Sequence, residues 1–379
     1  MKKVLILGAG FGGLETATGL SAVMKGGHTI TLVDKSDSFF VGFSKIDVLF
    51  GRRTEAEVRC HYADLRAEGV RFVQASITAI DTDSRTVTTS AGAFGYDYLV
   101  IALGADLDHD ATPGYRDSGG YEFYSMAGAT RLRPVLEAFG GGSLVLGILG
   151  TPYKCPPAPY EVACQMHELF IRQGIRDRVQ MKMVIPSPRP VPNLDVSGAL
   201  EKLLAERGIE LLASSPIRSI DAAHRQVISG ERSVAYELFI GVPVHVPPAV
   251  VRASKVGASG YVQASLTNLE TSIPGVYAVG DVTKLPAGEH AVPKAGAFAE
   301  DAARTVVSDI LVAEGLGNER VKFEAKGACY FEVGHERVGK VSANFFGGDT
   351  PQQGVEGPSS LFHVDKLQFE SSRRARWFK

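Results

Sequence analysis

The sequence predicts an α/β protein with two Rossmann-like dinucleotide-binding domains and a smaller C-terminal α+β domain. Three observations lead to this prediction. Near the N-terminus an apolar strand runs into a glycine turn and then a helix, and a second strand of the same kind, Ser143 to Gly150, occurs later. The chain is also 379 residues long, and chains beyond about 250–300 residues usually divide into more than one domain.

The N-terminal segment reads as one βαβ unit. Val4 to Leu7 is a continuous apolar run typical of a buried parallel strand, Gly8 to Gly13 form a turn, and Leu14 to Met24 has a helical pattern. A second strand, Thr29 to Val33, ends at Asp34. This order is the opening of a doubly wound fold.

The glycines of this turn have the spacing GxGxxG. At Gly8, Gly10 and Gly13 the missing side chains permit a tight turn, the close approach of a pyrophosphate, and close packing of the helix against the strand. The pyrophosphate would lie at the helix N-terminus, and Asp34 would accept hydrogen bonds from a ribose. The pattern predicts a dinucleotide site; the alternative is a glycine-rich turn in another α/β fold.

Later segments extend the pattern but change its second half. Tyr98 to Ala105 reads as a buried strand that runs into glycine, Gly275 to Asp281 as a strand that ends in an acid, and Pro293 to Val307 as a helix rich in small residues. After the strand that ends at Gly150, prolines and Cys155 replace the glycines that a nicotinamide nucleotide needs. The second unit is therefore not expected to bind NAD(P)H tightly.

Composition excludes several classes of function. The chain has 40 Lys and Arg against 42 Asp and Glu, so no global field attracts nucleic acid. No run reaches the roughly 18 apolar residues of a membrane span, which predicts a cytoplasmic protein with at most peripheral contact to the inner face of a membrane. Four scattered cysteines do not form a secreted disulfide framework, and the nine histidines lack metal-ligand spacing, so no metal is expected.

The order of GxGxxG, YDYLVIALGA (96–105) and GVYAVGD (275–281) resembles flavoproteins of glutathione reductase type. The resemblance implies FAD, and because no cysteine lies near Gly42 to attach the flavin, we expect it to be bound noncovalently. It places the FAD-binding domain at 1–110 and 236–311, the second Rossmann-like domain at 111–235 and the C-terminal domain at 312–379. Residues 40–50 lack the CxxxxC of disulfide reductases. The expected cofactor contacts are Gly8, Gly10, Gly12, Gly13, Asp34, Lys35, Ala102, Gly104, Gly280, Asp281 and Lys294.

The segment KCPPAPYE (154–161) and Cys329 in GACYFEVG narrow the resemblance to sulfide:quinone oxidoreductases and the flavin subunit of flavocytochrome c sulfide dehydrogenases. It implies that Cys155 and Cys329 face the flavin and carry sulfur, and that Lys294 lies near the flavin and the acceptor site. It implies oxidation of sulfide to sulfur or polysulfide, with a quinone as acceptor, and leaves a homodimer open. The chain departs from many of these enzymes because residues 121–134 lack a third cysteine and the long C-terminal amphipathic helices are curtailed.

The residue types are compatible with sulfur chemistry and leave alternatives. Cys155 precedes two prolines at a helix start, where the helix dipole and Lys154 would stabilise a thiolate. Glu161 would either move a proton at the sulfur site or only cap the helix. Lys294 would stabilise reduced flavin or orient a quinone; the alternative is a solvated charge at a helix start.

Other residues are given weaker roles. Cys164 is expected to be a packing residue on the opposite helix face from Cys155, and Cys60, in a stretch that reads as helical, has no expected role. Two roles are considered for four phenylalanines, either lining an apolar slot for a quinone or packing in the core: Phe331, Phe345, Phe346 and Phe362. Weak contact with a membrane surface is considered for the basic aromatic end, Arg373, Arg374, Arg376, Trp377 and Phe378.

Three other functions stay open at this stage. A flavocytochrome c type dehydrogenase would pass electrons to a haem protein, and the absence of an export signal counts against it. A type II NADH:quinone reductase would oxidise NADH, which the lost second glycine loop disfavours. A flavoprotein without turnover would bind FAD that sulfide does not reduce.

Overall fold

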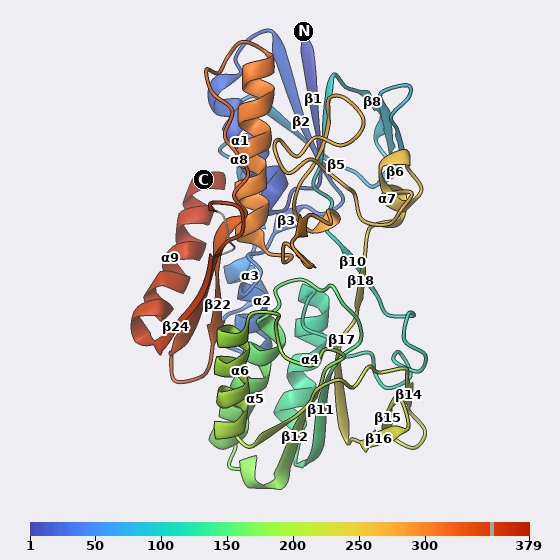
Figure 1. Ribbon diagram of the computed structural model, residues 1–379, viewed down its shortest axis with the longest axis vertical. Coiled ribbons are helices and arrows are strands. Elements are labelled where there is room, and N and C mark those ends of the chain that lie inside the picture. Colours follow the sequence, from blue (N-terminus) through green and yellow to red (C-terminus); the bar gives the residue numbers. More distant parts are fainter. Residues whose placement is uncertain (349–351) are drawn as a thin grey trace.

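The computed structural model describes residues 1–348 and 352–379. The first domain contains a five-stranded parallel sheet in the order β19-β9-β1-β2-β5. Helices α1 and α8 pack side by side on one face of it (Figure 1). These elements are β1 (Lys2–Leu7), α1 (Phe11–Val23), β2 (His28–Asp34), β5 (Val70–Gln74), β9 (Tyr98–Ile101), β19 (Val276–Ala278) and α8 (Gly296–Ala313).

The apolar run in β1 is explained by burial on both faces of this sheet. Val4 and Ile6 belong to the core under α1 and α8, whereas Leu5 and Leu7 belong to a separate core on the opposite face. Successive side chains of a strand point to opposite faces, so a strand covered on both sides has no polar positions. The N-terminal βαβ prediction is confirmed.

The second domain contains a four-stranded parallel sheet in the order β13-β12-β11-β17. Because β17 pairs with β11, this sheet continues past the boundary expected at residue 235, and the return to the first domain follows β18. The elements are α4 (Met126–Ala138), β11 (Gly142–Ile148), α5 (Ala158–Arg172), β12 (Val179–Val184), α6 (Leu194–Glu206), β13 (Ile209–Leu212) and β17 (Leu238–Val242).

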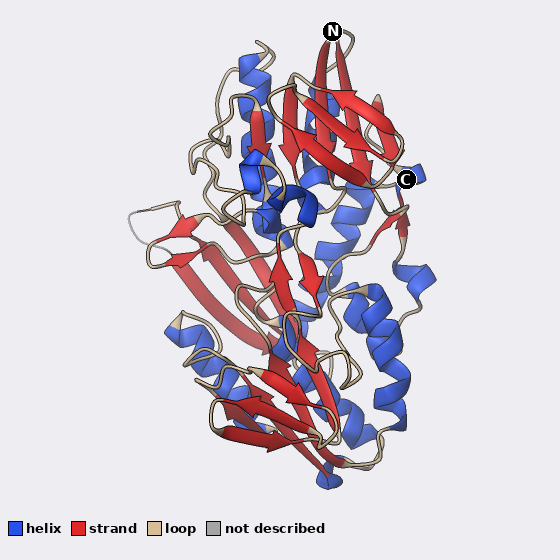
Figure 2. Cartoon of the chain, turned by 90° about the vertical axis from the view of Figure 1, so that its right-hand side faces the viewer, coloured by secondary structure: helices blue, strands red, loops and turns tan. Residues whose placement is uncertain are grey.

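The two domains repeat one plan. In each domain a three-stranded antiparallel sheet is inserted in the chain directly before a strand of the parallel sheet. This strand is β9 in the first domain and β17 in the second. The inserted strands are β6 (Ile77–Asp81), β7 (Thr86–Thr89) and β8 (Gly92–Gly95), and β14 (Ser219–Asp221), β15 (Gln226–Ser229) and β16 (Arg232–Ala235). The strand pair β10 (Asp106–Asp108) and β18 (Val244–Val246) connects the domains, as Figure 2 shows between the two halves.

Short elements complete the first domain. Cys60 lies in a two-residue strand that pairs with β3, so the expected helix at this position is wrong. These elements are β3 (Ser38–Phe39), α2 (Ser44–Leu49), α3 (Glu55–Val58), β4 (Cys60–His61), α7 (Ala249–Arg252), β20 (Pro286–Ala287) and β21 (His290–Ala291), with 3-10 turns at Tyr62–Asp64, Lys255–Gly257 and Gly280–Val282. A further 3-10 turn, Arg176–Arg178, lies between α5 and β12 of the second domain.

The C-terminal domain is a three-stranded antiparallel sheet and one long helix, α9, that lies beside both other domains (Figure 1). The aromatic end of α9 is buried in the first domain, where Trp377 is 0% exposed, and Arg373 and Arg376 pair with Glu300 and Glu15. The two aromatic residues of this end, Trp377 and Phe378, are therefore core residues of the first domain. The elements are β22 (Lys326–Glu332), β23 (Val338–Asn344), β24 (Gln352–Ser359) and α9 (Ser360–Trp377).

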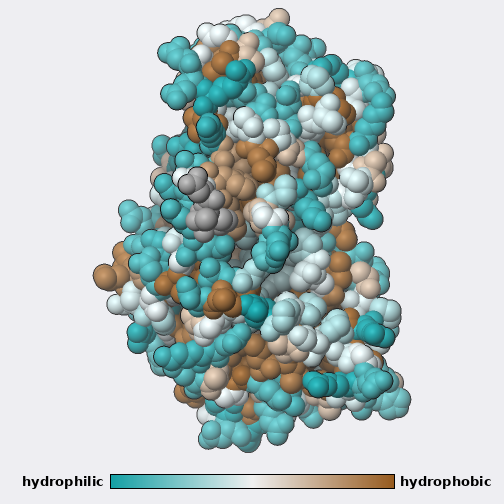
Figure 3. Space-filling view, viewed as in Figure 1, coloured by the Kyte–Doolittle hydropathy of each residue, from teal (hydrophilic) through white to brown (hydrophobic). Residues whose placement is uncertain are grey.

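The surface mixes polar and apolar residues. On the face drawn in Figure 3, apolar side chains occur in separate patches among polar ones. Within residues 1–348 and 352–379, none of the helices has the length and hydropathy needed to cross a bilayer.

Candidate active site

A cavity of about 330 Å³ lies where the three domains meet. Apolar rings form much of its wall: Phe39, Phe40, Phe43, Phe123, Tyr124, Tyr330 and Phe369. Ten of the predicted site residues also line it: Gly10, Gly12, Ala102, Gly104, Cys155, Glu161, Gly280, Asp281, Lys294 and Cys329. The other four, Gly8, Gly13, Asp34 and Lys35, lie outside this wall.

The glycines of this turn differ in their surroundings: Gly8 and Gly13 pack against backbone atoms, whereas Gly10 borders open space. Gly8 has φ +94°, and a Cβ there would lie 2.4 Å from the carbonyl oxygen of Ala102; a Cβ on Gly13 would lie 1.8 Å from that of Gly8. A Cβ on Gly10 would meet no atom within 4 Å. Gly10 is also the N-cap of α1, with no side chain capping the first amides. Free amides at a helix start beside open space form a cradle that fits a pyrophosphate.

Asp34 braces this turn from the end of β2. Its Oδ2 accepts a hydrogen bond from the amide of Ala9 at 2.7 Å, and its Oδ1 accepts one from Ser36 at 2.8 Å. Lys35 follows at the surface, with its side chain exposed. Both residues therefore lie next to the turn rather than on the cavity wall.

Lys294 holds the far side of the cavity together. Its Nζ donates to the carbonyl oxygens of Asp281 at 2.6 Å and Thr283 at 2.8 Å, and lies 3.7 Å from the centre of the Tyr261 ring. Burial lowers the pKa of Lys294 to about 8 and raises that of Asp281. At 6% exposure Lys294 is not the solvated charge considered as the alternative.

The loop before α5 is tied to the first domain. The amide of Cys155 donates to the carbonyl oxygen of Lys294 at 2.7 Å, and Lys154 donates through Nζ to that of Ala105 at 3.1 Å. Cys155 has φ +49°, and α5 begins after Pro157 as predicted. The segment after β11, which would have to bind the phosphates of a nicotinamide nucleotide, is therefore hydrogen-bonded to the first domain instead.

The two predicted sulfur residues are free, partly exposed thiols on the same wall, Cys155 before α5 and Cys329 on β22. Burial raises the pKa of Cys329 to about 12. Burial and the neighbouring Cys329 raise the pKa of Cys155 and outweigh the hydrogen bond from Ala158. In this structure burial therefore outweighs the stabilisation of a Cys155 thiolate that the helix start leads one to expect.

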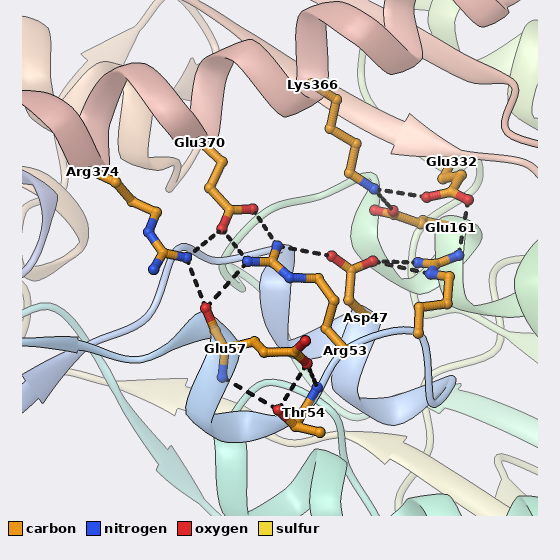
Figure 4. A network of polar contacts seen from close by, with 10 residues as sticks. Asp47, Arg53, Thr54, Glu57, Glu161, Glu332, Lys366, Glu370 and Arg374 are labelled. Carbon is orange, nitrogen blue, oxygen red and sulfur yellow. Dashed lines mark hydrogen bonds and ion pairs between the residues drawn. The ribbon is translucent and has the colours of Figure 1, made fainter.

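Glu161 lies on the cavity wall at 1% exposure. Its Oε1 accepts hydrogen bonds from Lys366 Nζ at 2.9 Å and from Gln165 at 3.2 Å. Lys366 reaches it from α9 and donates to Glu332 as well, as Figure 4 shows. Burial raises the pKa of Glu161 against the effect of Lys366. Glu161 lies in the first turn of α5, and the N-cap, Pro157, makes no capping hydrogen bond through its side chain.

Some site residues were not foreseen from the sequence. Lys45 on α2 lines the cavity, and burial lowers its pKa to about 8. Tyr124 lines it with a buried hydroxyl that has no hydrogen-bond partner among the described residues. Lys366 reaches the site from a helix 205 residues away in sequence from Glu161. The helix of Lys45 reads SKIDVL (44–49) and mixes charged with apolar residues, so no local pattern marks Lys45 as a site residue.

The phenylalanines proposed as a quinone slot do not meet in one place. Phe331 is buried in the core of the second domain, and Phe345 in the core of the first. None of the four, Phe331, Phe345, Phe346 and Phe362, is on the cavity wall. Cys164 on α5 is buried in the core of the second domain, which confirms its packing role.

The fold and the cavity define an oxidoreductase with two dinucleotide-binding domains. A family model described as pyridine nucleotide-disulphide oxidoreductase matches residues 2–303. The chain belongs to this family. It is an enzyme with FAD as cofactor, for which the glycine cradle and the buried end of β19 provide a fitting site.

Relatives and solved structures agree with this assignment. The chain is 24% identical to a mitochondrial sulfide:quinone oxidoreductase of Mus musculus, over 89% of this chain and 76% of the mouse protein. It is 25% identical to a type II NADH:quinone oxidoreductase of Staphylococcus aureus, over 90% of both. The crystal structure of the sulfide:quinone oxidoreductase of Aquifex aeolicus matches with a TM-score of 0.86 and 24% identity, over 99% of this chain and 92% of that one. This structural likeness concerns the fold.

Proposed function

We propose that the protein oxidises sulfide at Cys155 and Cys329 and passes the electrons through noncovalently bound FAD to a quinone. One observation carries the proposal: two free thiols from different domains line one cavity together with the glycine cradle of the cofactor. The mouse and Aquifex aeolicus proteins, both named sulfide:quinone oxidoreductase, support the substrate and the acceptor.

The two cysteines are proposed to work as an exchanging pair. Hydrosulfide attacks a disulfide between them; the S–S bond breaks and leaves a persulfide on Cys155 and a thiolate on Cys329. The persulfide and the thiolate then join as a trisulfide bridge, which releases two electrons and one proton. FAD supplies the two-electron acceptor, and Glu161 takes the proton. A second hydrosulfide attacks the central sulfur of the trisulfide and breaks one S–S bond, which frees one cysteine thiolate. This thiolate attacks the other cysteine sulfur, re-forms the disulfide and releases the chain as HSS⁻.

The remaining residues have proposed roles in binding. The amides at Gly10 and Gly12 would bind the pyrophosphate, Gly280 and Asp281 would contact the ribityl and phosphate region, and Lys294 would stabilise the reduced flavin. The apolar side of the cavity suits the planar, apolar ring of a quinone, because aromatic rings pack against one another on its wall. The ring centroids are 6.0 Å apart for Phe43 and Phe369 and 5.9 Å apart for Tyr330 and Phe369.

The tied loop argues against NADH as the electron donor. A nicotinamide nucleotide needs free backbone amides after β11, whereas here the amide of Cys155 is bonded to Lys294. The similarity to a type II NADH:quinone oxidoreductase makes NADH the competing donor to test.

The test is anaerobic reduction of the purified yellow protein. Sulfide should bleach the flavin absorbance, a soluble quinone should restore it, and NADH should leave it unchanged. Cys155→Ser and Cys329→Ser should each abolish bleaching by sulfide while FAD stays bound, and Cys164→Ala, which changes a cysteine outside the cavity, should not. Bleaching by NADH and not by sulfide would replace this proposal with NADH oxidation.

A further inference from the structure

Charged side chains from four parts of the chain form a ladder behind the cavity, in which acids and bases alternate (Figure 4). Lys366 joins Glu161 and Glu332, at 2.9 and 3.1 Å. Arg52 joins Glu332 and Asp47, at 2.8 and 2.7 Å. The ladder then returns to α9 through Arg53, Glu370 and Arg374.

The two carboxylates that share Lys366 are not equivalent. Glu332 has a second cation, Arg52, and although burial acts to raise its pKa, the charges of Lys366 and Arg52 hold that pKa below its usual value. Glu161 has Lys366 as its one ion-pair partner within the described residues. Of the acids in the ladder, Glu161 is the one on the cavity wall. When the surroundings push the pKa values of two carboxylates apart, the difference identifies the carboxylate that titrates. Here that carboxylate is Glu161.

The surroundings of Glu161 would otherwise make it neutral. Glu161 interacts electrostatically with five titratable groups: Lys366 on α9, Glu332 and Cys329 on β22, Cys164 on α5, and Cys155 in the loop before α5. Of these, Lys366 alone is positive. Lys366 itself is 3% exposed, so solvent does little to screen the pair. Without this ammonium, Glu161 and Glu332 would share a dry site, and one of them would be protonated.

We propose that Lys366 is a positioning residue that keeps Glu161 ionised and directed at the cavity, so that Glu161 can accept the proton released at the sulfur site. In this step the S–H bond of the persulfide breaks and an O–H bond forms on Glu161. The inference rests on the proposed function, because the persulfide that donates the proton forms only if the protein oxidises sulfide. Its electrostatic part, an ionised Glu161 that depends on Lys366, stands without it.

The ladder also sets where Lys366 lies. Glu370, one turn further along α9, receives two hydrogen bonds from Arg53, both at 2.8 Å. Two bonds in parallel fix a carboxylate in position and direction. The C-terminal helix α9 is therefore fixed to the loop after α2 in the position along its axis that places Lys366 next to Glu161.

The first experiment measures the protonation of Glu161 directly. Infrared difference spectra of FAD-bound Lys366→Met against the wild type at neutral pH should show a new carboxylic acid band. The band should be missing from Lys366→Arg, and adding Glu161→Gln to Lys366→Met should remove it. A folded, FAD-bound Lys366→Met protein without this band would overturn the proposal. The result does not depend on which donor reduces the flavin.

The second experiment measures the pH profile of flavin reduction by sulfide. In Lys366→Met the acid limb should move up by about one pH unit or more, so that the rate on that limb falls about tenfold or more. The matched control is Lys340→Met, which removes a partly exposed ion pair between Lys340 on β23 and Asp365 on α9, and its profile should match the wild type. An acid limb unmoved in Lys366→Met would overturn the proposal. A wild type that sulfide does not reduce would instead refute the proposed function.

A double variant covers the case in which Lys366→Met does not fold. Removing one partner of a buried ion pair leaves an uncompensated charge, whereas removing both relieves it. Glu161→Gln with Lys366→Met should therefore fold and bind FAD where the single variant does not. A double variant as unstable as the single one would show that Lys366 serves packing alone and would overturn the proposal.

Discussion

The end of α9 provides a sharp test of how the C-terminal domain is held. Trp377 is fully buried among Phe11, Phe39 and the core of the first domain, and its indole N–H donates to Glu15 at 3.1 Å. Truncation of a fully buried Trp to Ala costs about 3–5 kcal/mol. Trp377→Phe keeps most of the apolar contact and loses mainly the hydrogen bond, worth about 1.5–3 kcal/mol to a charged acceptor. We expect Ala to cost clearly more than Phe.

The assay is urea unfolding of the FAD-bound protein followed by circular dichroism, with equal slopes required for the comparison. Leu367→Ala is the control on the same helix, because Leu367 is 49% exposed and should change the unfolding free energy by less than about 0.5 kcal/mol. A loss below about 1 kcal/mol in Trp377→Ala would refute the packing described for this helix.

Three other predictions follow from the site. Gly13→Ala should prevent FAD binding by displacing the turn, since its Cβ would lie 1.8 Å from the carbonyl oxygen of Gly8, whereas Gly10→Ala should keep the fold and weaken FAD affinity, as titration of the apoprotein would show. Because burial raises the pKa of Cys329 to about 12, its alkylation by iodoacetamide, followed by mass spectrometry, should still accelerate at a pH where a free cysteine has levelled off; a plateau near pH 9 would contradict this. Removal of FAD should lower the unfolding temperature, because free FAD at about 1,000 times its Kd adds about 4 kcal/mol to stability.

The parts of the fold that depend on local sequence were predictable. The apolar runs at β1, β9 and β11 and the glycine turn before α1 were read correctly, because burial on both faces of a parallel sheet and a tight turn both leave marks in neighbouring residues. Cys60 was misread as helical because its strand has two residues, too few for a periodic pattern.

The site was predictable only where a motif carries it. Cys155 and Glu161 stand in one recognisable segment, but the ammonium that Glu161 needs comes from α9. A lysine in an amphipathic helix reads as a solvated charge, and nothing local distinguishes Lys366 from its exposed neighbours. The pKa of Cys155 was misjudged for the same reason, because a helix start was visible in the sequence and the burial around it was not.

Each domain contributes a different chemical part of the cavity, and the bonds that cross the boundaries hold those parts together. The first domain provides the glycine cradle, the second provides Cys155, and the C-terminal domain provides Cys329. The bond from Cys155 to Lys294 and the ion pair from Lys366 to Glu161 are two of the polar ties across these boundaries at the cavity. A separation of the domains would break both ties and admit water, which would lower the thiol pKa values and weaken the ion pair together. The protonation of the sulfur site therefore depends on the docking of all three domains.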